Sequence, residues 1–202
     1  MKTNTIIMYL VDNKLVVYNQ KIIIETFEKN IVHNGKINKP HEFYRCLENY
    51  VKKHKLNKSL FNNNICFLLE PGATNTDREV INNIFTKLSF NNIEFINISS
   101  LLDIKKNKVW MLLNDTYLYI IYTNYKAKKD YIFIEYKIFK NNTNLIINHL
   151  LHFTKNKSVI ISGISKKIEE FSSKLETLNN GKVYYMNDSI SYYINKIKNT
   201  LS

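Results

Sequence analysis

The sequence predicts an α/β fold made of two halves that repeat the same order of strands and helices. Each half opens with a strand-turn-strand segment, and the turn carries Asp12 in the first half and Asp115 in the second, 103 positions later. Within these two segments, the residues that are identical at this interval are Met8 and Met111, Leu10 and Leu113, Asp12 and Asp115, and Leu15 and Leu118. In both halves three strands precede alternating helices and strands, which is typical of a mixed sheet. We therefore expect two domains, residues 1–105 and 106–202, each with a five-stranded mixed sheet and helices.

Hydrophobic periodicity and turn residues place the elements of the first half. The expected strands are 5–11, 15–18, 21–27, 64–69 and 92–98, and the expected helices are 40–55, 76–88 and 99–104. Asp12-Asn13 are residue types that tolerate positive φ and form tight hairpins. Pro40 opens the helix 40–55, which has an apolar stripe and lysines at its C-terminal end. The isoleucines at 22–24 indicate a strand covered on both faces, so we expect helices over this sheet.

The second half follows the same order after a hairpin at 109–122 that turns at Asn114-Asp115. The further strands are expected at 131–136, 158–163 and 182–186, and the helices at 144–154, 165–178 and 189–201. The segment 131–136 mirrors the isoleucine strand of the first half and places Glu135 in the position of Glu25.

Composition limits the kinds of protein that the chain can be. With 202 residues, 45% of them hydrophobic, the chain can bury a large core. It has neither an apolar run long enough for a spanning helix nor a signal-peptide cleavage site, so we expect a cytoplasmic protein. Cys46 and Cys66 sit in apolar patterns typical of buried thiols, and no Cys/His spacing suggests zinc. We attribute the excess of Asn, Lys, Ile and Tyr to an AT-rich genome.

Three passages and the element order resemble the actin-like ATPase superfamily, whose two core subdomains are ribonuclease-H-like. Residues 32–37 are similar to the approach to the first core helix in the bacterial MreB, FtsA and PilM proteins. Residues 69–79 are similar to their strand-Pro-loop-Thr-x-x-Glu-Arg passage, with Arg and Glu in reversed order. Residues 158–163 resemble the strand that enters the adenosine motif. The resemblance covers nearly the whole chain and implies two tandem ribonuclease-H-like subdomains, with the peripheral subdomains of a complete actin missing.

The chain departs from this family where the family binds phosphate. Each family hairpin carries Asp-x-Gly, because glycine lets backbone N–H groups close on the phosphates. The residues that would form a vestigial nucleotide site here are Asp12, Asn13, Asp115, Thr116 and Gly163. Neither turn contains glycine, and only Gly163 remains of the glycines of the adenosine motif. We therefore expect no catalytic residue, no metal site, and weak or absent binding of ATP and Mg²⁺.

Other candidate residues have simpler explanations. Turn chemistry explains Asp12 and Asp115 better than a shared metal does. His149 and His152 lack a third ligand in sequence, and strand alternation accounts for Glu25 and Glu135 as well as a catalytic pair would. The last helix has an apolar face that suits either a partner or membrane interface or packing against the second sheet, which we favour. That face consists of Ile190, Tyr193, Ile194, Ile197 and Leu201.

These observations predict a non-catalytic, actin-like adaptor in a membrane-associated assembly, at the inner face of the cell membrane. Pilus or secretion, division and cell-shape machinery are the candidate systems, and the resemblance to PilM favours type IV pilus assembly. Its partners would be proteins, including further copies of the chain. The alternatives are a polymerising, nucleotide-binding bacterial actin relative and a nucleic-acid-binding protein that uses the net charge of +12.

Overall fold

The computed structural model shows a chain that divides into two compact units, Met1–Ser100 and Leu101–Ser202. The described residues are 5–54, 56, 64–90, 92–105, 107–124, 126, 128–135, 148, 150, 151, 154, 157–163, 168–178, 182–186 and 188–201.

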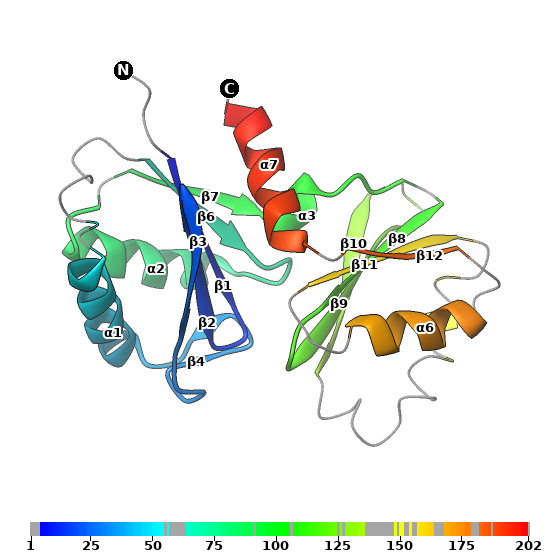
Figure 1. Cartoon of the computed structure of the whole chain (residues 1–202), viewed down its shortest axis with the longest axis horizontal. Coiled ribbons are helices and arrows are strands. Elements are labelled where there is room, and N and C mark those ends of the chain that lie inside the picture. Colours follow the sequence, from blue (N-terminus) through cyan, green and yellow to red (C-terminus); the bar gives the residue numbers. More distant parts are fainter. Residues whose placement is uncertain are drawn as a thin grey trace. The chain divides into compact units, whose positions relative to one another are not determined.

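The first unit is built on one mixed sheet of five strands in the order β3-β2-β1-β6-β7. Its elements are β1 (Thr5–Val11), β2 (Lys14–Asn19), β3 (Lys21–Thr26), β4 (Val32–His33), β5 (Lys36–Ile37), α1 (Pro40–Lys53), β6 (Asn64–Leu69), α2 (Asn75–Lys87), β7 (Ile93–Asn97) and α3 (Ile98–Leu101). β1, β2 and β3 pair antiparallel, whereas β1, β6 and β7 pair parallel. α1 and α2 lie on the same face of this sheet (Figure 1). β4 and β5 form a separate two-stranded hairpin.

The second unit repeats this topology with the strand order β10-β9-β8-β11-β12. Its elements are β8 (Lys108–Leu113), β9 (Tyr117–Thr123), β10 (Lys129–Glu135), β11 (Ser158–Gly163), α6 (Ile168–Leu178), β12 (Val183–Tyr185) and α7 (Ser189–Leu201). Two mixed five-stranded sheets of like topology confirm the predicted fold class. Most of the predicted helix 144–154, including His149 and His152, lies outside the described residues.

The 103-residue interval is reproduced in the pairing of the strands. Leu10 pairs with Leu15 in the first hairpin, and Leu113 pairs with Leu118 in the second. The Asn114 N–H donates to the Tyr117 carbonyl over 2.9 Å, so Asn114 still belongs to the ladder. The second turn is therefore Asp115-Thr116, one residue later than Asn114-Asp115, and matches Asp12-Asn13.

The core of the first unit lies between its sheet and the two helices. Alternate strand residues such as Ile6, Met8 and Phe67 meet the apolar stripe of each helix, for example Phe43 of α1 and Phe85 of α2. Burying a side chain of this size contributes about 1.5–3 kcal/mol. Packing against the sheet therefore fixes both helices.

The prediction that β3 is covered on both faces is wrong. Ile22 and Ile24 are 40% and 53% exposed, whereas Ile23 packs on the core from the opposite face. β3 is an end strand of the sheet, and α1 and α2 cover only one face. A run of β-branched residues reflects strand propensity as well as burial.

The predicted equivalence of Glu25 and Glu135 is also wrong. Glu25 lies opposite Leu15, but the residue opposite Leu118 is Ile134, and Glu135 lies opposite Tyr117. A shift of one residue turns a side chain to the other face of its strand. The two glutamates therefore occupy different faces of their sheets.

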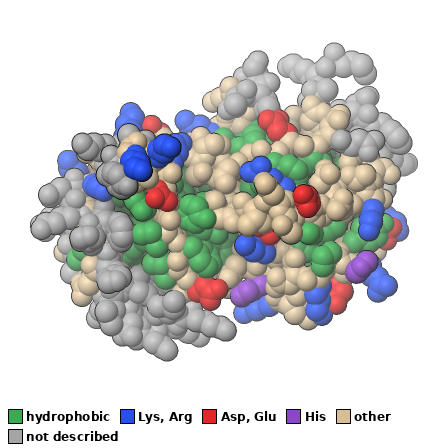
Figure 2. Space-filling view, turned by 180° about the vertical axis from the view of Figure 1, so that it is seen from behind, with side chains coloured by type: hydrophobic (Ala, Val, Ile, Leu, Met, Phe, Trp, Pro, Cys, Tyr) green, Lys and Arg blue, Asp and Glu red, His purple; other side chains and the backbone are tan. Residues whose placement is uncertain are grey.

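The positive side chains are dispersed on the face of the molecule that Figure 2 shows. On the face shown in Figure 2, Lys and Arg side chains stand in small separate groups among polar and hydrophobic areas. Among the described residues, no helix has the length and apolar character needed to cross a bilayer. Both cysteines are free thiols, Cys66 buried and Cys46 half-buried.

Candidate functional site

The candidate site of the first unit lies at the edge where the parallel strands β1, β6 and β7 reach their carboxyl ends. Ligands of open α/β sheets commonly bind beyond these ends. Asp12 follows β1, Glu70 follows β6, and Asn97 is the last residue of β7. The strand pairing brings these three chain positions to one edge.

The first hairpin turn is held by hydrogen bonds from neighbouring loops. Asp12 is 2% exposed and has a left-handed φ of 50°. Its carbonyl oxygen accepts from the Gly35 N–H over 3.0 Å. Asn13 donates its side-chain amide to the Phe27 carbonyl over 2.7 Å, and the Phe27 N–H donates to the Asn13 carbonyl over 2.7 Å. Asn13 therefore has a structural role in fixing this turn.

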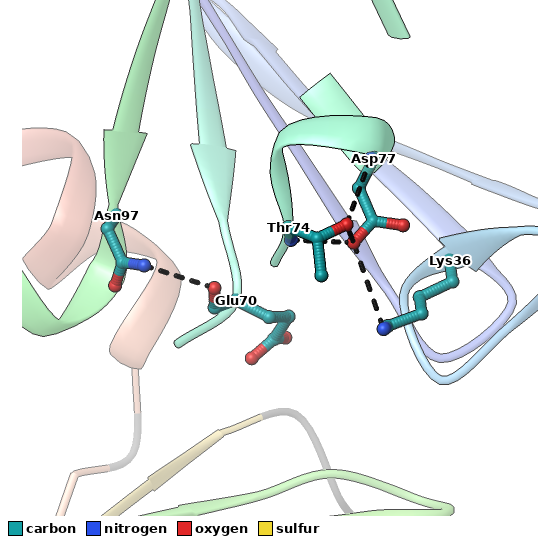
Figure 3. A network of polar contacts seen from close by, with 5 residues as sticks. All are labelled: Lys36, Glu70, Thr74, Asp77 and Asn97. Atoms are coloured by element: carbon teal, nitrogen blue, oxygen red, sulfur yellow. Dashed lines mark hydrogen bonds and ion pairs between the residues drawn. The ribbon is translucent and has the colours of Figure 1, made fainter. Parts of the chain in front are cut away.

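Glu70 is the second buried carboxylate of this edge beside Asp12, with 6% of its surface exposed. Its Oε1 accepts from the Tyr9 hydroxyl over 2.5 Å. Its backbone oxygen accepts from Asn97 Nδ2 over 3.2 Å and from the Ala73 N–H over 3.0 Å (Figure 3). Three elements thus fix the position of Glu70: β1, the loop that follows β6, and β7.

A second polar group lies beside Glu70 at the start of α2. Thr74 caps the helix by accepting from the Asp77 N–H over 3.2 Å, and Asp77 accepts in return from the Thr74 N–H over 2.7 Å. The cap lies two residues before the predicted helix start at residue 76. Lys36 Nζ lies 3.7 Å from Asp77 Oδ2, and these side chains point toward one another in Figure 3.

A cavity of about 20 Å³ lies among these groups, with Gly35, Lys36, Glu70 and Asp77 in its wall. A water molecule needs roughly 10–15 Å³, so there is room for about one. Glu70 and Asp77 could orient such a water or accept its proton.

The corresponding edge of the second unit has a different character. Asp115 is exposed and Thr116 half-buried in the turn between β8 and β9. Gly163 ends β11 opposite Leu113, with φ of 134°. A Cβ at this glycine would lie 2.0 Å from the Leu113 carbonyl oxygen, so no other residue fits.

Ser189, the first residue of α7, engages both backbone groups of Gly163. The Gly163 N–H donates to Ser189 Oγ over 2.9 Å, and Ser189 Oγ donates to the Gly163 carbonyl over 2.6 Å. The end of β11 is thereby joined to the beginning of α7.

Most described residues of the apolar face of α7 are buried. Tyr193, Ile194 and Ile197 are buried, Ile190 is half-buried, and the Leu201 side chain lies outside the described residues. The Tyr193 hydroxyl is 3.1 Å from Ser162 Oγ of β11. This burial supports packing and does not support a free interaction helix.

Comparison with known proteins identifies the fold. No protein-family model matches the sequence, and no curated protein is significantly similar to it. Among solved structures, ADP-bound MreB5 of Spiroplasma citri aligns over 98% of this chain and 95% of its own, with 9% identity and a TM-score of 0.65. The MamK double helical filament aligns over 98% and 99%, with 8% identity and a TM-score of 0.61. The PilM–PilN type IV pilus biogenesis complex aligns over 93% and 89%, with 7% identity and a TM-score of 0.58. The chain has the actin-like fold.

Within this actin-like fold, five residues of the first unit belong to the candidate site and were missed by sequence reasoning. They are Tyr9, Lys36, Glu70, Thr74 and Asp77. Glu70 had a usable signal, because a carboxylate directly after a fully apolar strand lies at a carboxyl edge of the sheet. The contact of Tyr9 with Glu70, 61 positions away, had no signal in the sequence.

Proposed function

We propose that this chain is a non-catalytic, actin-like scaffold that acts by holding protein partners in a membrane-associated assembly. Its actin-like fold and its similarity to the PilM structure, which was solved in complex with PilN, support this proposal. Type IV pilus assembly is the preferred system for the same reason, ahead of division and cell-shape machinery.

The observation that carries the proposal is that donors near the two hairpins are already bonded within the protein. A phosphate cradle needs several backbone N–H groups that point to one place and have no other acceptor. Here the N–H groups of Gly35, Asn114 and Gly163 all donate to atoms of their own unit. Binding a phosphate through them would first break these bonds, so we expect little affinity for ATP.

Mg-ATP binding to the full chain tests this proposal. Stabilisation follows RT ln(1 + [L]/Kd) and is negligible while Kd exceeds the ligand concentration. At millimolar Mg-ATP we expect Tm to rise by less than about 1 °C, and phosphate release to stay at the level of a protein-free sample. A rise of several degrees that Asp12→Ala or Asp115→Ala abolishes would contradict the proposal. Glu176→Ala, an exposed carboxylate of α6, is the control variant.

A polymerising protein is the second candidate, favoured by the similarity to the MamK filament. It makes a different prediction in the same samples. A polymerising, nucleotide-dependent protein would sediment with Mg-ATP and stay in the supernatant without it. The scaffold proposal requires equal sedimentation in both conditions.

A further inference from the structure

A groove of about 570 Å³ lies between α1 and α2 on the outer side of the first unit. Its volume falls within the roughly 300–1,000 Å³ typical of ligand sites. The groove is separate from the hairpins and from the water-sized cavity beside Glu70, and neither Asp12 nor Glu70 lines it.

The groove follows from how the two helices meet the core. Each helix directs its most apolar stripe to the sheet, so residues on the flank of that stripe stay partly uncovered. Tyr44 of α1 and Val80 of α2 are half-buried and pack on the edge of the core, while Ile84 is buried. With Pro40 they give the groove an apolar lining.

The polar groups of the groove are available to a ligand. His41, Asn83 and Lys87 are exposed, and they make no side-chain hydrogen bond or ion pair with the residues that the structure describes. Among the residues that the structure describes, no carboxylate lines the groove. Two acids of α1 are held by lysines elsewhere on that helix, Glu42 by Lys39 at 2.9 Å and Glu48 by Lys52 at 3.3 Å.

The electrostatic character of the groove is therefore positive. Lys87 is the cationic residue type of the lining, and Pro40 and His41 are the first two residues of α1, where the helix dipole is positive. The net charge of +12 on the whole chain adds a long-range attraction for acidic molecules.

We propose that this groove binds an acidic amphipathic helix of a partner protein. The apolar face of the helix would lie on Tyr44, Val80 and Ile84, and a carboxylate at its margin would pair with Lys87. Helix-in-groove recognition uses apolar anchors at helical spacing in this way. The inference rests on the proposed scaffold function, since it names the class of partner that the scaffold holds.

The apolar anchors and the ion pair at Lys87 are expected to contribute unequally to the affinity for the helix. Burial of the apolar anchors provides most of the affinity, whereas an exposed ion pair changes binding by only about 2- to 5-fold. Reversing the charge of Lys87 replaces attraction by repulsion. We therefore expect Lys87→Glu to weaken an acidic helix by at least about 5-fold.

The test uses two synthetic 16-residue helices with leucines at i, i+3, i+4 and i+7. One has glutamates flanking the leucine stripe and the other has lysines. Binding to the full chain is measured by fluorescence anisotropy at about 0.15 M salt, where charges beyond about 8 Å are screened. The chain variants are Lys87→Glu and Lys182→Glu, which have the same net charge, Lys182 being an exposed lysine of the second unit.

We expect the glutamate peptide to bind at least about 10-fold more tightly than the lysine peptide. Lys87→Glu should weaken the glutamate peptide and strengthen the lysine peptide, and Lys182→Glu should do neither. Val80→Asp should weaken both peptides, because it places a charge in the apolar lining. NMR shift changes should map to α1 and α2.

The proposal is overturned if neither peptide binds, if both bind equally, or if Lys182→Glu acts as strongly as Lys87→Glu. Shift changes confined to other elements would overturn it too. These outcomes do not contradict the scaffold proposal. That proposal is contradicted only by Mg-ATP binding or by nucleotide-dependent sedimentation.

Discussion

Gly163 shows how one residue can join three elements. It ends β11, lies directly against the backbone of β8, and bonds through both backbone groups to Ser189 of α7. Its φ of 134° is a conformation that L side chains rarely adopt. In the sequence it is the one glycine that remains of the adenosine motif, and in the structure it has a packing and backbone role.

Gly163→Ala should therefore destabilise the second unit by more than about 3 kcal/mol, since strained φ and the clash with Leu113 add together. Gly35→Ala is the matched control. Gly35 has φ of 71°, in the left-handed region where a side chain costs about 1–2 kcal/mol. Urea unfolding followed by circular dichroism measures both, and equal losses would argue against the backbone contact at Gly163.

The elements illustrate what local pattern predicts well and what it misses. α1 was placed by its proline, its apolar stripe and its terminal lysines, and it begins at Pro40 as expected. α2 begins earlier than expected. The reciprocal cap is formed by Thr74 and Asp77, and not by Thr76 and Glu79. Several residues near a helix start can act as a cap, and only the path of the preceding loop selects one of them.

Thr74→Ala removes this cap and should lower the free energy of unfolding by about 1 kcal/mol, within the usual range of 0.5–2 kcal/mol. Thr86→Ala, at an exposed position within α2, is the control and should change stability by less than about 0.5 kcal/mol. Thermal and urea unfolding of the two variants provide the measurement. A loss for Thr86→Ala as large as that for Thr74→Ala would show that the cap contributes nothing specific.

At the scale of the whole molecule, the repeat predicted the fold more reliably than any single segment did. The identity of Leu10 with Leu113 and of Leu15 with Leu118 reflects equivalent rungs of two ladders. Long-range polar contacts had no such signature. The bond between Tyr9 and Glu70 depends on the parallel pairing of β1 with β6, which local pattern does not specify.

Two buried weak acids, the Cys66 thiol and the Tyr50 phenol, make the stability of the protein depend on alkaline pH. Burial, aided by Glu94, raises the pKa of Cys66 from 9.0 to about 12, and burial, aided by Glu25, raises the pKa of Tyr50 from 10.0 to about 12. The folded state thus keeps protons that the unfolded chain loses. Stability from these groups is complete below about pH 9 and falls as pH rises toward 12, by up to about 1.4 kcal/mol per group and pH unit.

Urea midpoints at pH 7, 9 and 10.5 should therefore decline over the last interval. Cys66→Val and Tyr50→Phe should each flatten that decline. Tyr184→Phe should not, because Tyr184 is exposed. If the urea midpoint declined equally with pH in the unaltered protein and in all three variants, other groups would control the loss of stability at alkaline pH.

The end strands β3 and β10 have a consequence for the behaviour of the protein in concentrated solution. Both present apolar side chains to solvent, Ile22 and Ile24 on β3 and Tyr131 and Phe133 on β10. Such edges favour the joining of strands from different copies, and lysines along them oppose it. Lys21 and Lys129 begin these strands, and a net charge of +12 keeps copies apart. At about 1 M salt the screening length falls to roughly 3 Å, so the same protein becomes prone to aggregate through its sheet edges.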